Sequence, residues 1–381
     1  MNPVEEAKKI SEQIIAWRRD FHMWPELKYE EERTSRIVEE HLREWGYRIK
    51  RVGTGIIADI GEGEKTIALR ADMDALPIQE ENDVPYRSRV PGKMHACGHD
   101  AHTAMLLGAG KIIAEHIGEF NGRVRLIFQP AEEGGNGALK MIEGGALEGV
   151  DAIFGFHVWM ELPSGVIGIR DGPFLAGAGF FTIKFRGLGG HGAYPHFARD
   201  PIPAGAEAVM TLQTIVSRNV SPFETAVLSV TAFNAGTAHN VIPEESELKG
   251  TYRFYNEEVG KLIEKRIGEI VSSIARAHNL ESKSEIVELV PPTINDKEMA
   301  NFARTVAEKY GFRHSDVPPS MGAEDFAYYL QRVPGAFLAL GIRNEEKGIV
   351  YPPHHPRFNV DEDVLYLGTA MEVALALEFL R

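Results

Sequence analysis

The densest group of chemically active side chains lies at positions 95–102, which read HACGHDAH. Three of the chain's 14 histidines and its only cysteine, Cys97, fall within these eight positions. Thiolate and imidazole are the usual ligands of zinc and related metals. The alternative is a helix-capping loop with incidental histidines, because short motifs also occur by chance. The residue types favour a metal site.

Two adjacent carboxylates, Glu132 and Glu133, follow directly after a predicted strand at 124–128. Adjacent acids repel, and placing them together at a strand end favours a counter-charge such as a metal. One of the two can bind the ion while the other acts as a general base. Taken alone, a solvated turn explains such a pair better, because charged residues are usually on the surface.

Further candidate ligands follow other predicted strands. His157 comes after a strand at 152–156, Asp72 and Asp74 come after a strand at 67–71, and two histidines lie in PPHHPRF at 352–358. Each is ambiguous alone, but ligands in open α/β sheets bind beyond the carboxyl ends of the strands. We therefore expect one site at one edge of one sheet. The number of candidates suits two ions, which lie ~3.5–4 Å apart in such centres.

The elements that must position these residues alternate between helix and strand. Apolar spacing predicts helices at about 3–18, 31–45, 102–117 and 138–142, and the strands named above lie between them. After an interruption the pattern resumes, with helices near 298–310, 324–332 and 363–380 and a strand at 336–340. Such alternation predicts an α/β fold with a mixed open sheet covered on both faces. We assign residues 1–176 and 291–381 to this catalytic, metal-binding domain.

The interruption, residues 177–290, has a pattern of its own. Strands are predicted at 180–185, 225–233, 247–255 and 284–289, and helices at 201–217 and 257–278. The order β-α-β-β-α-β is typical of an α+β ferredoxin-like unit large enough to fold as a domain. We therefore predict that this domain is inserted into the catalytic one.

Composition excludes several classes of partner. The chain has 381 residues and a formal net charge of −14, which disfavours nucleic acid and anionic membranes. Neither a signal peptide nor a long apolar run is present, so we expect a cytoplasmic protein that does not span a membrane. The string GLGGHG at 187–192 fits a dinucleotide motif, but no helix begins at that loop. There is also no G-x-S-x-G for a serine hydrolase.

The motifs together resemble the dinuclear-metal family of aminoacylases, hippurate hydrolases, auxin-conjugate hydrolases and thermostable carboxypeptidases. The resemblance runs nearly end to end, through RRDFHMWPEL at 18–27, RADMDALP at 70–77, the 95–102 segment, QPAEEG at 129–134, GGH at 189–191, NVIP at 240–243, MGAEDF at 321–326 and HHPRF at 354–358.

The resemblance implies a role for each matching residue. The implied metal ligands are Cys97, His99, Glu133, His157 and His354, with His355 as the alternative to His354. Glu132 would be the general base, and Asp72 and Asp74 would orient the ligand imidazoles. The inserted domain would be a lid and form a homodimer or dimer-based oligomer, in which His191 and Asn240 reach the partner's site and His191 assists catalysis. Arg253 and Gly322 would contact the substrate, and the Arg253 guanidinium would bind the carboxylate of the substrate.

The expected activity is hydrolysis of the amide bond of an N-acyl amino acid or short peptide. The two divalent ions, zinc or else cobalt, manganese or nickel, would activate water, and Glu132 would take its proton. One alternative is a deacetylase of an acylated lysine or diaminopimelate intermediate. An alternative from another class is a metal-bound scaffold without catalysis, which the presence of Glu132 argues against.

Overall fold

The computed structural model describes residues 1–381, and the chain forms two compact units. The first unit comprises Met1–Phe174, Ile294–Pro318 and Asp325–Arg381. The second comprises Leu175–Thr293 and Pro319–Glu324. None of the helices is both long and apolar enough to cross a membrane.

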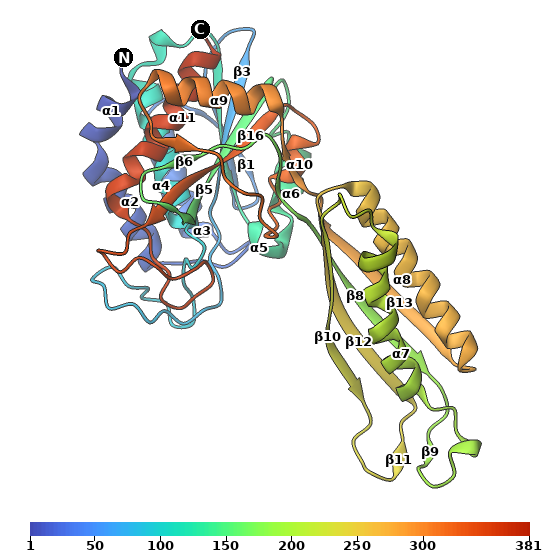
Figure 1. The fold of residues 1–381 in the computed structure, drawn as a ribbon. Helices are drawn as coiled ribbons and strands as arrows, with labels where there is room; N and C mark the ends of the chain where they lie inside the picture. Colours follow the sequence, from blue (N-terminus) through green and yellow to red (C-terminus); the bar gives the residue numbers. More distant parts are fainter. The chain divides into compact units, whose positions relative to one another are not determined.

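The first unit is built on an eight-stranded mixed sheet (Figure 1). The strand order is β1 (Arg48–Val52), β2 (Gly55–Gly61), β4 (Arg123–Gln129), β3 (Thr66–Asp72), β5 (Ala152–Pro163), β16 (Gly335–Arg343), β6 (Ile167–Gly168) and β15 (His314–Ser315). The central strands β4, β3, β5 and β16 are parallel to one another, whereas β1 and β2 add an antiparallel edge. Every residue of β3 is buried, as expected for a parallel strand covered on both faces. The predicted mixed α/β sheet is confirmed.

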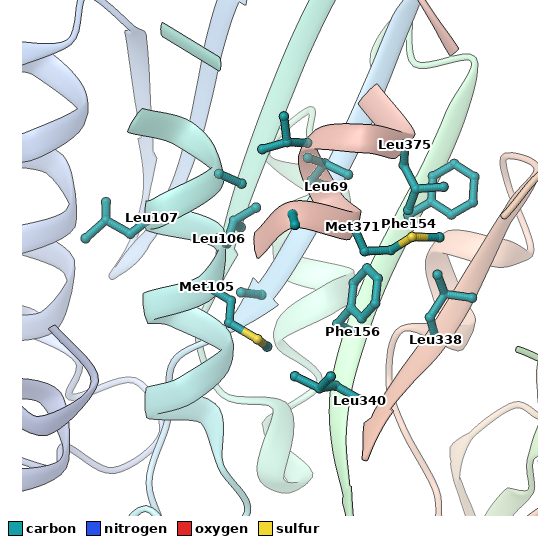
Figure 2. Packing of buried hydrophobic residues seen from close by; sticks show 14 of the residues in the cluster. Leu69, Met105, Leu106, Leu107, Phe154, Phe156, Leu338, Leu340, Met371 and Leu375 are labelled. Atoms are coloured by element: carbon teal, nitrogen blue, oxygen red, sulfur yellow. The ribbon is translucent and has the colours of Figure 1, made fainter. Parts of the chain in front are cut away.

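Helices surround this sheet. They are α1 (Pro3–Lys9), α2 (Ser11–Met23), α3 (Glu32–Glu44), α4 (His99–Glu115), α5 (Glu132–Gly135), α6 (Gly137–Glu143), α9 (Lys297–Lys309), α10 (Ala327–Leu330) and α11 (Leu365–Phe379), with 3-10 turns at Ile117–Glu119 and Glu362–Val364. Figure 2 shows the core, where Met105 of α4 and Met371 of α11 lie near Phe156 of β5 and Leu340 of β16. Because α4 and α11 are buried on nearly all sides, they carry apolar residues all round.

Several predicted boundaries were wrong, for physical reasons that bear on the site. The strand at 152–156 continues to Pro163, because β16 pairs with it along that length, so His157 lies within a strand. The helix predicted from 102 begins at His99, directly after Gly98 with φ +88°. The helix predicted at 324–332 is only α10, because Asp325 is drawn into hydrogen bonds with buried side chains. The helix predicted at 3–18 is broken at Ile10, whose backbone is not helical.

The second unit has its own sheet and core. Along the chain it contains β8 (Gly177–Arg186), α7 (Pro201–Thr214) with a π-helical turn at Ile215–Asn219, β10 (Ala226–Ala235), β12 (Glu245–Phe254), α8 (Glu257–Ala277) and β13 (Glu281–Val290). The four strands form an antiparallel sheet in the order β10-β12-β8-β13, and both helices cover one face of it (Figure 1). Shorter elements of this unit are β9 (Gly190–His191), paired with β11 (Val241–Ile242), and a 3-10 turn at Pro195–Phe197. The strands β7 (Gly172–Leu175) and β14 (Thr293–Asn295) pair with each other, and most of their residues belong to the first unit.

Candidate active site

The Cys97–His99 loop lies at the carboxyl edge of the large sheet. Gly98 has φ +88°, and a Cβ there would lie 2.4 Å from Cγ2 of Val158 on β5. Glycine therefore allows both the left-handed turn and the close approach to β5. The turn places the Cys97 sulfur 3.4 Å from Nε2 of His157.

Asp74 joins the loop to the acidic pair after β4. Its Oδ1 accepts a hydrogen bond from the backbone N–H of Glu132 at 3.0 Å, and its Oδ2 accepts one from Glu133 at 2.9 Å. The same Oδ1 lies 3.2 Å from Nδ1 of His99. One buried carboxylate therefore orients both the imidazole of His99 and the backbone that carries the two glutamates.

The predicted ligands converge into overlapping groups whose ligand atoms lie within 4.8 Å of one another. These groups are Cys97 with His99 and His157, Cys97 with Glu133 and His354, and His99 with Glu132 and Glu133. His355 belongs to none of them: its ring stacks on Tyr351, with the centroids 4.6 Å apart. Its Nδ1 accepts a hydrogen bond from the backbone of Arg357.

One orphaned atom shows that the cluster fits a metal. Nε2 of His99 is buried and has no hydrogen-bond partner, whereas Nδ1 of the same ring lies against Asp74. A buried ring nitrogen without a partner is unfavourable unless a ligand such as a metal ion satisfies it. Sulfur, imidazole and carboxylate together suit zinc and its neighbours in the first transition row.

The electrostatics of the cluster also favour bound cations. Burial opposes charge on Cys97 and His157, yet their mutual attraction lowers the pKa of the thiol to about 6 and raises that of the imidazole to about 9. Hydrogen bonds to Cys97 and Glu133 raise the pKa of His354 to about 10. The sulfur and the carboxylate therefore attract positive charge, to which the neighbouring imidazoles contribute.

His102 has a function that the sequence did not reveal. Its Nδ1 lies 2.6 Å from Oδ1 of Asp72, and its Nε2 lies 2.9 Å from the backbone N–H of Val158. Because that N–H donates to Nε2, the ring proton is on Nδ1 and donates to Asp72. Both nitrogens are occupied, so His102 joins Asp72 to the strand that carries His157 and is not itself a ligand.

Asp72 is in turn held by a buried network of hydrogen bonds, which was not predicted from the sequence either. Arg70 donates to Asp72 at 2.6 Å, to Gln129 at 2.9 Å and to Asp325 at 3.1 Å. The lone cation in the otherwise apolar strand at 67–71 was the available signal, because a buried charge requires partners.

The remaining predicted residues lie in the second unit. His191 is exposed on β9 opposite Val241, and the carbonyl of exposed Asn240 accepts a hydrogen bond from Gly192 at 2.8 Å. Arg253 lies on β12 and donates to the carbonyl of Tyr252 at 2.9 Å. Gly322 is exposed, and its N–H donates to the Ser320 hydroxyl.

An open mixed sheet with cysteine, histidine and glutamate side chains grouped at its carboxyl edge, and a second carboxylate beside them, is typical of a metallohydrolase. The model of peptidase family M20/M25/M40 matches residues 68–378, and the chain belongs to this family. The predicted family is thereby confirmed, and the protein is an enzyme that hydrolyses amide bonds. One solved structure of the M20 family is described as a dinuclear metal-binding peptidase, and this chain has groups of residues whose spacing suits metal ligands.

Relatives are similar over nearly the whole chain. An IAA-amino acid hydrolase of Arabidopsis thaliana is 42% identical over 376 residues, covering 96% of this chain and 86% of that protein. Thermostable carboxypeptidase 1 of Saccharolobus solfataricus is 40% identical, covering 98% and 97%. The crystal structure of a dinuclear metal-binding peptidase of the M20 family from Bacillus subtilis has a TM-score of 0.86 and 36% identity, covering 98% and 99%.

Proposed function

We propose that the protein hydrolyses N-acyl amino acids and short peptides with a free C-terminus. The observation that carries this proposal is the position of Glu132 beside His99 and Glu133, with both glutamate amides fixed by Asp74. The similarity to an IAA-amino acid hydrolase and to a carboxypeptidase supports an amide next to a carboxylate as the substrate.

In this proposal two divalent ions, zinc in the first instance, are held by Cys97, His99, Glu133, His157 and His354. Bound metal would supply activation of water and stabilisation of negative charge. Glu132 takes the proton of the attacking water and returns it to the nitrogen of the leaving amine. Asp74 keeps the Glu132 backbone in place, and Asp72 acts through His102 to keep β5 in place.

The test is a Glu132→Ala variant assayed on N-acetyl and N-benzoyl amino acids, with its metal content measured in parallel. We expect two ions per chain and a loss of kcat of at least ~100-fold, because general-base catalysis contributes about that much. Glu143→Gln, which changes an exposed acid on α6, is the matched control. Near-normal activity of a fully metal-loaded Glu132→Ala protein would exclude the mechanism, and an inactive wild type would exclude the function.

We further propose that residues 177–290 form a lid and dimerisation domain, and that the partner subunit's His191 and the partner subunit's Asn240 complete each site. Arg253 and Gly322 would contact the substrate. In support, exposed His191 lies on β9, and exposed Asn240 directly precedes β11, the strand that pairs with β9. Tyr194, whose ring centroid is 5.2 Å from that of His191, is 55% exposed, and Phe197 is 74% exposed. Exposed aromatic side chains in one place are typical of an interface.

Mixing two inactive variants tests this arrangement. A dimer of one Glu132→Ala chain and one His191→Ala chain has one intact site, if His191 acts across the interface. Random exchange makes half of the dimers mixed, so about a quarter of the wild-type activity should return. No recovery after subunit exchange, verified by mass spectrometry of differently labelled chains, would place His191 in its own subunit's site or outside catalysis.

A further inference from the structure

The loop that carries the two glutamates is contacted by a short segment near the N-terminus. This 28–31 segment connects α2 to α3, and the 131–135 loop follows β4. The Lys28 ammonium donates to the carbonyl of Glu133 at 3.1 Å, and the Tyr29 hydroxyl donates to the carbonyl of Gly135. The Glu31 carboxylate accepts the backbone N–H of Ala131 at 2.9 Å. Three side chains from one segment therefore hold one loop.

The 131–135 loop needs such support because its backbone conformation is unfavourable. Ala131 has φ 55° and ψ 45°, in the left-handed region that residues with a Cβ rarely adopt. Gly134 and Asn136 are left-handed as well. A non-glycine residue stays in that region only when its surroundings fix it, and here the fixed residue directly precedes Glu132.

Glu31 is free to fix Ala131 because another residue caps the helix. Glu31 lies at the N-cap of α3, but its side chain makes no capping hydrogen bond. Glu26 does so instead, since its two oxygens accept the N–H groups of Arg33 and Thr34, both at 2.8 Å. The Glu31 carboxylate is fully buried, and it also accepts a hydrogen bond from the Thr54 hydroxyl at 2.7 Å.

The result is a run of three successive amides, each held by a carboxylate. Glu31 holds that of Ala131, and Asp74 holds those of Glu132 and Glu133. We propose that the 28–31 segment is a positioning element for the general base, and that Glu31 is the positioning residue on which it depends. This inference rests on the proposed function for the identity of the base.

Hydrogen exchange measured by mass spectrometry on the full chain tests the inference without turnover. In Glu31→Ala, exchange of the amides in 131–135 should accelerate at least about 10-fold, since hydrogen bonds to charged groups are the stronger ones. Exchange in β3 should not change. Glu31→Gln should stay near wild type, because its amide oxygen still accepts the Ala131 N–H. Glu30→Ala is the matched control, since Glu30 is exposed and pairs with Lys93.

Kinetics on N-acyl amino acids supply the second readout. Glu31→Ala should lower kcat at least about 10-fold with little change in KM and with both metals retained, and Glu31→Gln should restore kcat. If Glu31→Ala does not fold, Tyr29→Phe removes only the contact to Gly135, and it should accelerate loop exchange and lower kcat by a smaller factor. Unchanged loop exchange and kcat in Glu31→Ala, or in Tyr29→Phe where that variant is used, would overturn the inference.

The two hypotheses fail separately. If the wild type hydrolyses no amide, the proposed function is wrong, yet the exchange measurement still shows whether Glu31 holds the loop. If the wild type is active and Glu31→Ala has normal kcat and normal loop exchange, only the positioning role is wrong.

Discussion

Glu372 makes the stability of the protein depend on pH. It lies on α11 in the apolar core and is 2% exposed, and its Oε2 has no hydrogen-bond partner. Burial raises the pKa of this carboxyl well above its usual value of 4.5. The folded chain therefore keeps a proton that the unfolded chain loses, and folding becomes less favourable as the pH rises from about 4.5 towards the folded-state pKa.

The size of the effect follows from proton linkage. While Glu372 stays protonated only in the folded state, stability falls by about 1.4 kcal/mol for each pH unit. Glu372→Gln removes this dependence and keeps the shape. Between about pH 5 and pH 7, the free energy of unfolding of the wild type should fall by up to ~2.7 kcal/mol relative to the variant.

Urea unfolding of both proteins across this pH range measures the difference, with Glu12→Gln on the exposed side of α2 as the control. The stability curves of wild type and Glu372→Gln should diverge as the pH rises, and that of Glu12→Gln should follow the wild type. Parallel curves for wild type and Glu372→Gln would show that Glu372 ionises alike in the folded and unfolded chains, which refutes the reasoning.

Three other predictions concern the site and the core. Asp74→Asn should weaken zinc binding about 10- to 100-fold in calorimetry, because residues that orient ligand imidazoles contribute about that much, and equal affinity would contradict the role. Arg18→Met should cost ~3–5 kcal/mol in urea unfolding, because it leaves the buried carboxylate of Asp100 without the cation 2.8 Å away; a loss below about 1 kcal/mol would contradict it. Phe156→Ala, at a 1% exposed core position, should cost ~3–5 kcal/mol, and a much smaller loss would mean that the core collapses around the site.

The sequence predicted that several candidate residues lie close together, because Glu133 follows soon after one strand of the sheet and His157 lies in another. Ligand types and strand order together placed Cys97, Glu133 and His157 at one edge, and the structure brings them together. The parallel central strands were predictable as well, because their runs are mostly apolar, as in β3, where Arg70 is the exception within the predicted run 67–71.

The supporting contacts could not be predicted, because they join residues far apart in the sequence. Glu31 is 100 residues from Ala131, and His102 is 56 residues from Val158. At Glu31 the sequence indicates an ordinary helix start, and only the structure shows that Glu26 has taken over the capping. The antiparallel strands β1 and β2 were missed because charged side chains interrupt their apolar pattern.

The occupied ring of His102 has a consequence for how the protein acquires its metals. Asp72, His99 and His102 form a further group with ligand spacing, which could bind an ion on the other side of His99. Because both nitrogens of His102 are already hydrogen-bonded, an ion there would have to break the contact to Asp72 or to Val158. The hydrogen bonds of His102 therefore disfavour an ion bound between Asp72, His99 and His102, and leave Cys97 and His157 as the partners that His99 can share an ion with.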